Sequence, residues 1–137
     1  MSKELRIILA GALLVVGALA SGCSMRVRES ELYGVYVAEY ENGREKLTLE
    51  KDGRYVQEVT PKGSDKPTIN SGPWKYHHLS NRVELEDCFG VNDGFGKIRP
   101  DFATNRGGCS FGVERRWLIA GRLRLGPDEA SPLWKVQ

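Results

Sequence analysis

The histidines and cysteines of this 137-residue chain are the side chains best suited to catalysis or metal binding. His77 and His78 are adjacent, and adjacent strand residues point to opposite faces of a sheet, so the two cannot chelate one metal ion together. One histidine could instead bind a metal ion together with Glu84 or Glu86 of the next expected strand. Cys88 as a nucleophile would need one of these histidines as its base. The favoured interpretation is a chain with no catalytic site, no metal site and no cofactor.

The N-terminus has the pattern of an export signal. Lys3 and Arg6 precede an apolar or glycine-containing run over residues 7–20. A secretory signal needs about 7–15 such residues, whereas a membrane-spanning helix needs about 20. Residues 19–23, with the sequence LASGC, resemble the lipobox of bacterial lipoproteins. The resemblance implies that Cys23 is lipidated and becomes the first residue after cleavage.

The lipoprotein resemblance also implies a location. In that family an Asp after the lipidated cysteine retains the protein in the inner membrane, and here Ser24 follows Cys23. We therefore expect attachment to the outer membrane of a two-membrane bacterium, facing the periplasm or the cell surface. Two or three acyl chains make a lasting anchor. The alternatives are an uncleaved anchor or an ordinary signal peptide with a coincidental cysteine.

The remaining cysteines, Cys88 and Cys109, are expected to form a disulfide, because an exported chain folds in an oxidising compartment. On the chain-entropy model a bond closing about 22 residues stabilises by roughly 3 kcal/mol. A metal site is disfavoured because neither cysteine has C-x-x-C spacing. The expected organisation is a signal peptide over residues 1–22, a lipidated tether over 23–31 and one domain over 32–137.

The charge balance disfavours nucleic acid as a partner. The formal net charge is +2, and no basic stripe is interleaved with stacking aromatics. Four arginines near the C-terminus could make a local basic patch on alternate strand positions. The favoured interpretation for them is the solvated outer face of a sheet. These residues are Arg115, Arg116, Arg122 and Arg124.

The domain has the pattern of an all-β protein. Residues 46–50 alternate, Asp52-Gly53 predicts a hairpin turn, and the returning strand 54–60 puts Tyr55, Gln57 and Val59 on one side. Residues 61–71 and 88–108 are expected to be loops. The expected strands are 32–41, 46–50, 54–60, 72–76, 82–87, 111–120, 122–125 and 133–136. The absence of helical periodicity after Ala20 favours an antiparallel up-and-down meander that forms a small closed or half-closed barrel.

Part of this pattern is similar to small lipocalin-like bacterial lipoproteins. The run L-x-L-x-x-D-G-x-Y from Leu47 to Tyr55, the G-x-W from Gly72 to Trp74 and a following V-x-L strand carry the likeness. It covers roughly residues 32–87 and implies an up-and-down barrel that binds a small apolar ligand or a lipid. Such a cavity would be lined by residues including Leu47, Leu49, Tyr55, Trp74, Tyr76 and Trp117.

The irregular segment 89–108 is the most unusual part of the chain. Loops longer than about 12–15 residues are functional or disordered, and phenylalanines spaced through this one argue against disorder. Phe89, Phe95 and Phe102 are expected to plug one end of the barrel, fastened by the disulfide. As a binding loop it would have a polar rim of Lys97, Arg99, Asp101 and Arg106. The favoured function is a non-catalytic lipoprotein that engages an envelope protein partner, and the alternative is the small-ligand binder.

Overall fold

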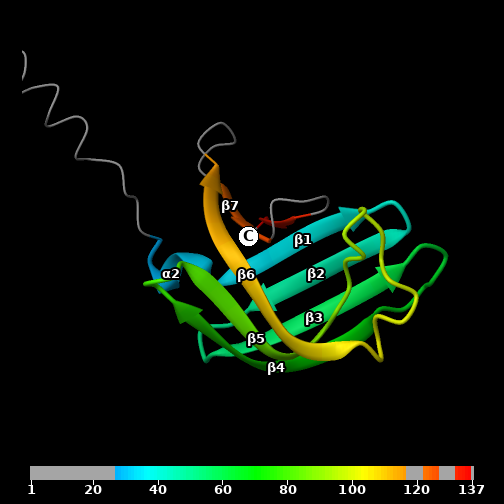
Figure 1. Ribbon diagram of the computed structural model, residues 1–137, viewed down its shortest axis with the longest axis horizontal. Coiled ribbons are helices and arrows are strands. Elements are labelled where there is room, and N and C mark those ends of the chain that lie inside the picture. Colours follow the sequence, from blue (N-terminus) through cyan, green and yellow to red (C-terminus); the bar gives the residue numbers. More distant parts are fainter. Residues whose placement is uncertain (1–26, 117–121, 127–131, 137) are drawn as a thin grey trace, which may run out of the picture.

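The computed structural model describes residues 27–116, 122–126 and 132–136, which form one short helix and eight strands. Each strand pairs antiparallel with the next, and β8 returns to β1, so the sheet closes into an up-and-down barrel (Figure 1). The predicted fold class is confirmed. The elements are α2 (Glu29–Leu32), β1 (Gly34–Tyr40), β2 (Gly43–Leu49), β3 (Arg54–Pro61), β4 (Thr68–His77), β5 (Arg82–Phe89), β6 (Arg106–Arg116), β7 (Arg122–Leu125) and β8 (Leu133–Lys135).

The strand boundaries differ from expectation where backbone pairing overrides composition. β4 begins at Thr68 rather than at residue 72, because Thr68–Asn70 pair with Val59–Gln57 of β3. The expected loop over 61–71 is therefore a turn over 62–67. β5 and β6 likewise extend into the segment 88–108, because Phe89 pairs with Arg106. What remains between them is the loop 90–105.

A single helical turn stands where the expected tether over 23–31 meets the expected strand over 32–41. α2 is held by reciprocal contacts, in which the backbone N of Arg28 donates to Glu31 Oε2 at 2.8 Å and the backbone N of Glu31 donates to the Arg28 carbonyl at 2.9 Å. Leu32 at its end is fully buried, and Val27 is also buried in the barrel core. At four residues, the only helix in the described part of the chain is too short to cross a membrane. Cys23 and the lipobox lie outside the described residues.

The expected alternation of inward residues is confirmed on the β2–β3 hairpin. Leu47, Leu49, Tyr55 and Val59 have at most 1% exposure, and Gln57 is buried among them. At the turn, the backbone N of Arg54 donates to the Asp52 side chain at 3.0 Å, and Gly53 adopts φ +82°, a conformation that glycine takes without strain. The half of the barrel next to α2 is filled by such apolar side chains.

Within the described residues, β7 and β8 cover only part of the length of their neighbouring strands. β7 pairs with β6 only over Val113–Arg116, and β8 pairs with β1 only at Tyr36 and Val37. Both short strands lie toward α2. The described residues therefore place no β7 or β8 partner beside the ends of β1 and β6 that approach loop 90–105.

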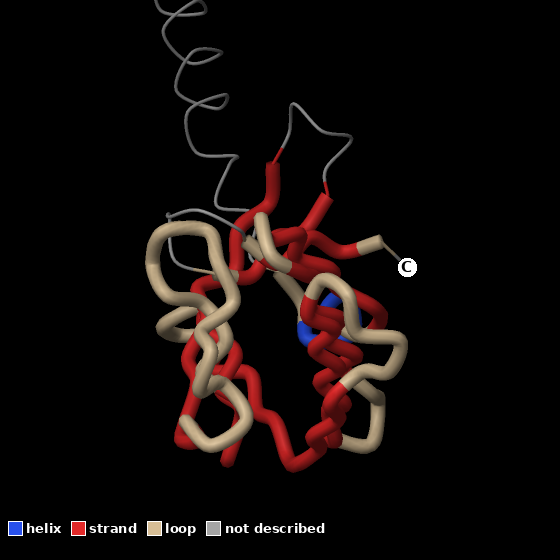
Figure 2. Tube along the Cα trace, turned by 90° about the vertical axis from the view of Figure 1, so that its right-hand side faces the viewer, coloured by secondary structure: helices blue, strands red, loops and turns tan. Residues whose placement is uncertain are grey.

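Loop 90–105 packs on this second end of the barrel, which Figure 2 views directly. Phe89 and Phe102 meet edge to face with ring centroids 5.5 Å apart, and they form a buried cluster with Val59, Val91 and Ile98. The expected plug is thus made by two of the three phenylalanines. Phe95 was wrongly assigned to it, because that side chain lies at a loop tip and is 87% exposed.

The β1–β2 turn fastens the loop to the barrel. The side-chain amide of Asn42 donates to the Ile98 carbonyl at 3.0 Å and accepts from the Ile98 backbone N at 2.7 Å. Gly43 follows with φ +154°, and an added Cβ there would come within 2.5 Å of Ile98 Cδ1. The close approach of the loop therefore requires glycine at this position.

Candidate ligand-binding site

A hydrogen-bonded network of buried polar side chains occupies the barrel interior near loop 90–105. Gln57, which is 1% exposed, donates through Nε2 to Glu45 Oε1 at 2.8 Å and to the Phe89 carbonyl at 3.2 Å. Its Oε1 accepts from the Phe89 backbone N at 2.8 Å. These three bonds fix the Gln57 amide orientation, so Glu45 Oε1 must act as an acceptor.

Glu45 is the unusual member of this network. It lies on β2 between Ala38 of β1 and Val59 of β3, and only 4% of it is exposed. Its Oε2 accepts from the Tyr40 hydroxyl at 2.9 Å. Burial raises the pKa of Glu45, and the bonds from Gln57 and Tyr40 oppose that rise only in part. Burial and the nearby carboxylate also raise the pKa of Tyr40, so its hydroxyl keeps its proton.

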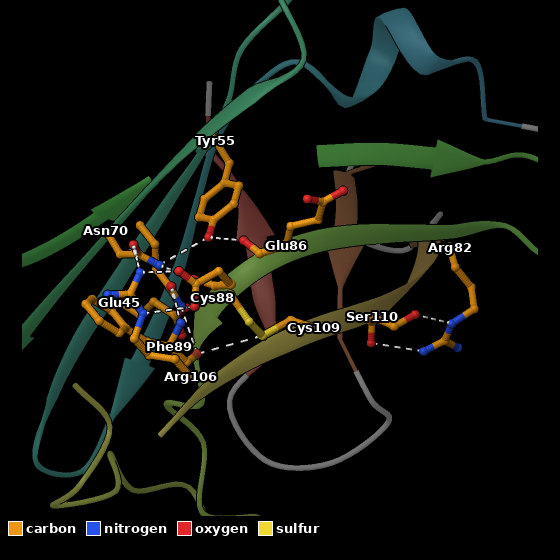
Figure 3. The surroundings of a disulfide bond; sticks show 12 residues. Glu45, Tyr55, Asn70, Arg82, Glu86, Cys88, Phe89, Arg106, Cys109 and Ser110 are labelled. Carbon is orange, nitrogen blue, oxygen red and sulfur yellow. Dashed lines mark hydrogen bonds and ion pairs between the residues drawn. A yellow bond between two sulfur atoms is a disulfide. The ribbon is translucent and has the colours of Figure 1, made fainter. Parts of the chain in front are cut away.

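A bulge in β5 turns backbone carbonyls toward the interior (Figure 3). Asp87 adopts φ +53°, and the pairing register with β6 shifts between Leu85 and Cys88. The Glu86 carbonyl accepts from the Tyr55 hydroxyl at 2.7 Å, and the Asp87 carbonyl accepts from Asn70 Nδ2 at 2.6 Å. The bulge thus gives two buried donors their acceptors.

The cysteine pair lies next to this bulge. Cys88 and Cys109 are bonded across β5 and β6 with their Cα atoms 6.0 Å apart, inside the usual disulfide range. The predicted pair is therefore seen at disulfide distance. Arg106, at the start of β6, donates to Asp87 at 2.6 Å and to Asn70 Oδ1 at 2.8 Å. It therefore links β6 to the bulge in β5 and to β4.

A cavity of about 250 Å³ lies where β7 and β8 fall short of the loop. Its polar side chains include Tyr40 and Glu45, and most of its remaining lining is apolar. The lining residues are Tyr40, Glu45, Phe89, Gly90, Val91, Asn92, Cys109, Ser110, Phe111, Leu125, Gly126 and Leu133. An apolar cavity with a few convergent polar groups is the usual form of a small-molecule site.

The aromatic residues predicted to line a cavity lie elsewhere in the core. Tyr55 is fully buried, Trp74 donates through Nε1 to the Glu50 carbonyl at 3.0 Å, and the half-buried Tyr76 donates to the Val27 carbonyl at 3.0 Å. None of the three lines the cavity described above. Leu47 and Leu49 pack in the same apolar core. Trp117 lies outside the described residues.

Glu45 was missed because the expected strand began at residue 46. Residues 45, 47 and 49 share one face of β2, so a glutamate preceding two inward leucines was the available signal. The polar rim expected on segment 89–108 consists of side chains that are paired within the protein. Lys97 pairs with Glu41 at 3.4 Å and Arg99 with Asp101 at 3.1 Å.

The histidines and C-terminal arginines make no site near the cavity. His77 Nε2 lies 2.8 Å from Glu84 Oε2 on the exposed outer wall. Among the described residues no group of three or more histidine, cysteine, aspartate or glutamate side chains could hold a metal ion. The solvated face expected for the arginines is wrong for Arg124, whose side chain is 6% exposed and pairs with Glu114. Arg115 also reaches inward, to Glu31 at 2.6 Å.

Compared with models of known protein families, with curated proteins and with solved structures, the chain matches none of them. The cavity and its buried glutamate are therefore the basis for a functional interpretation.

Proposed function

We propose that this chain is a non-catalytic binding module of a bacterial envelope, anchored to the outer membrane through acyl chains on Cys23, and that it binds a small, largely apolar ligand. The observation that carries the proposal is the largely apolar cavity of about 250 Å³ between loop 90–105 and the described residues of β7 and β8. An apolar cavity of about 150 Å³ holds benzene, so this one suits a single ring or a short chain.

The geometry supports an outward orientation of this site. α2, the first described element after Cys23, lies at the end of the barrel opposite loop 90–105 (Figure 1). A lipid anchor at Cys23 would therefore hold the α2 end toward the membrane and the cavity end away from it. A ligand would then reach the cavity from the aqueous side.

Native mass spectrometry of the protein extracted from its own membranes tests the ligand. We expect a retained small molecule that is lost in Leu125→Phe, which fills the cavity, and kept in Leu79→Phe, the same change at a residue that is 89% exposed. Unliganded protein in all three samples would contradict the proposal, as would equal retention by both variants. Thermal unfolding confirms that each variant is folded.

The intact mass of the unreduced protein from the same membranes tests the anchor. We expect the mass of residues 23–137 plus acyl groups, less two hydrogens for the disulfide. A mass matching the full chain, or an unacylated shorter chain, would exclude lipidation at Cys23.

A second candidate function, binding of an envelope protein partner, is favoured by Phe95. Its loop tip is held by side-chain acceptors: Asp93 Oδ1 accepts from the backbone N of Phe95 at 2.7 Å and of Lys97 at 3.0 Å. The ring is therefore presented to solvent on an ordered turn. A photo-crosslinker at residue 95 should trap one dominant protein in intact cells, whereas the equally exposed position 79, at the other end of the barrel, should not. Diffuse or equal crosslinking would exclude this function.

A further inference from the structure

We propose that the ligand carries a cationic amine, and that this amine pairs with the Glu45 carboxylate inside the cavity. The proposal rests on the cavity-binding function above and names the chemical class of the ligand. It derives from the hydrogen bonds of Glu45, from the distribution of cations and from the lining of the cavity.

The hydrogen bonds of Glu45 leave acceptor capacity unused. A carboxylate offers about four lone-pair sites. Gln57 occupies one on Oε1, and the Tyr40 hydroxyl occupies one on Oε2. Both partners are uncharged donors, so they orient the carboxyl group and bring no positive charge to it.

No cation of the described residues pairs with Glu45. Arg124 pairs with Glu114 and Arg106 with Asp87, and none of the ion pairs in the described ranges includes Glu45. Outside the described ranges, the segments 117–121 and 127–131 contain no Lys, Arg or His in their sequence, whereas Lys3, Arg6 and Arg26 precede residue 27. A buried carboxylate is costly when it is ionised and unpaired, so a cationic ligand would supply the positive charge that no described residue brings to Glu45.

The rest of the lining determines the body of the ligand. Phe89, Val91, Phe111, Leu125 and Leu133 surround the cavity with apolar surface. These side chains favour an alkyl or aryl group attached to the ammonium. An anionic ligand such as a fatty acid would instead bring its carboxylate against Glu45, and like charges in a buried site repel. The site therefore selects short alkylammonium or arylalkylammonium compounds.

Isothermal titration calorimetry with three six-carbon probes tests the charge requirement. The probes are hexylamine as its ammonium ion, 1-hexanol and hexanoate. Against the wild-type protein we expect hexylammonium to bind at least about tenfold more tightly than 1-hexanol, as a charge-assisted hydrogen bond implies. Hexanoate should show no saturable binding.

Glu45→Gln is the matched variant. Its amide oxygen can still accept from Gln57 and its NH₂ can donate to the Tyr40 oxygen, so the network is retained while the charge is removed. We expect hexylammonium affinity to fall at least about tenfold and 1-hexanol affinity to change less than about twofold. Thermal unfolding of the variant checks that it is folded.

The outcomes separate this inference from the proposed function. In one outcome, hexylammonium and 1-hexanol bind equally to the wild type, neither affinity changes in Glu45→Gln, and both are lost in Leu125→Phe. The cavity then binds ligands, but the proposed charge pairing is overturned. Failure of hexylammonium to bind wild-type protein also overturns the inference. The retained small molecule of the mass-spectrometric test then decides independently whether the cavity function stands.

Discussion

The barrel half next to α2 is filled with apolar side chains, whereas the half next to loop 90–105 combines a polar network, a plug and a cavity. At the α2 end Leu32, Tyr36 and Leu85 have at most 1% exposure and pack in one cluster. At the other end Glu45 and Gln57 are equally enclosed but hydrogen-bonded to each other. Strand length accompanies the contrast, because the described pairings of β7 with β6 and of β8 with β1 lie on the side of the barrel toward α2.

The contrast separates the part expected to stabilise the domain from the part proposed to bind a ligand. Burial of apolar surface supplies most of the folding free energy, whereas buried polar groups stabilise little and fix geometry instead. The α2 half is therefore expected to determine whether the barrel folds. The loop half is expected to determine what the barrel binds.

The largest expected effect is at the α2 end. Trp74 is buried, its ring meets Tyr33 edge to face at 6.0 Å, and it bonds the Glu50 carbonyl. Trp74→Ala should lower the free energy of unfolding by about 3–5 kcal/mol, measured by urea denaturation. Phe95→Ala, at an exposed ring, should change it by less than about 0.5 kcal/mol. A Trp74→Ala barrel as stable as wild type would show that this end does not dominate stability.

Removal of the disulfide is expected to act on the loop half. The double variant Cys88→Ser, Cys109→Ser removes a cross-link between residues 21 positions apart in the sequence. It should lower the free energy of unfolding by about 3 kcal/mol on the chain-entropy model. Amide exchange should accelerate first in loop 90–105, because the bond lies beside the bulge from which this loop departs. Uniform acceleration over the whole barrel, or none, would contradict the division into two halves.

Loss of the buried charge should stabilise the unliganded protein. Burial raises the pKa of Glu45, so between its ordinary pKa of about 4.3 and the raised value the folded protein holds a proton that the unfolded chain has released. The free energy of unfolding of the wild type therefore falls as pH rises through that interval, and its full value is present only below it. Glu45→Gln should be more stable at pH 8 by about 1–3 kcal/mol.

The difference between variant and wild type is the quantity to measure, by urea denaturation from pH 4 to pH 8. Other shifted groups, such as Asp93, whose pKa is lowered by backbone hydrogen bonds, are present in both proteins and cancel. The difference should shrink toward zero near pH 4. A difference that is constant across this range would show that Glu45 does not titrate differently on folding.

The smallest effect is expected on the outer wall. His77 and Glu84 form an exposed pair at 2.8 Å, and exposed ion pairs contribute about 0–1 kcal/mol. His77→Ala should leave both stability and hexylammonium binding nearly unchanged. Loss of binding in this variant would place functional chemistry outside the cavity and weaken the comparison between the two halves.

Local patterns were sufficient to predict the β2–β3 hairpin and much of the strand order. Leu47 and Leu49 share a buried face, and Asp52-Gly53 forms the expected turn. The early start of β4 was not predictable in the same way, because residues 68–70 are recruited by pairing with β3 rather than by their own propensity.

The site was harder to predict than the fold. The cavity depends on how far β7 and β8 extend, and strand ends are set by partners distant in sequence. Trp74 and Tyr76 were expected to line a cavity. Strand alternation predicts only that a side chain points inward, and it does not distinguish a cavity wall from a filled core. Gln57 was already in phase with Tyr55 and Val59, and Glu45 had a similar signal, since an acidic residue in phase with inward leucines is rare unless it has a partner.

The pairing of β8 with β1 also constrains the order of folding. Tyr36 of the first strand meets Lys135 of the last, so β1 keeps one open edge until nearly the whole chain is available. An open strand edge is a template for pairing with other chains. Deletion of residues 133–137 should therefore cause self-association as much as instability.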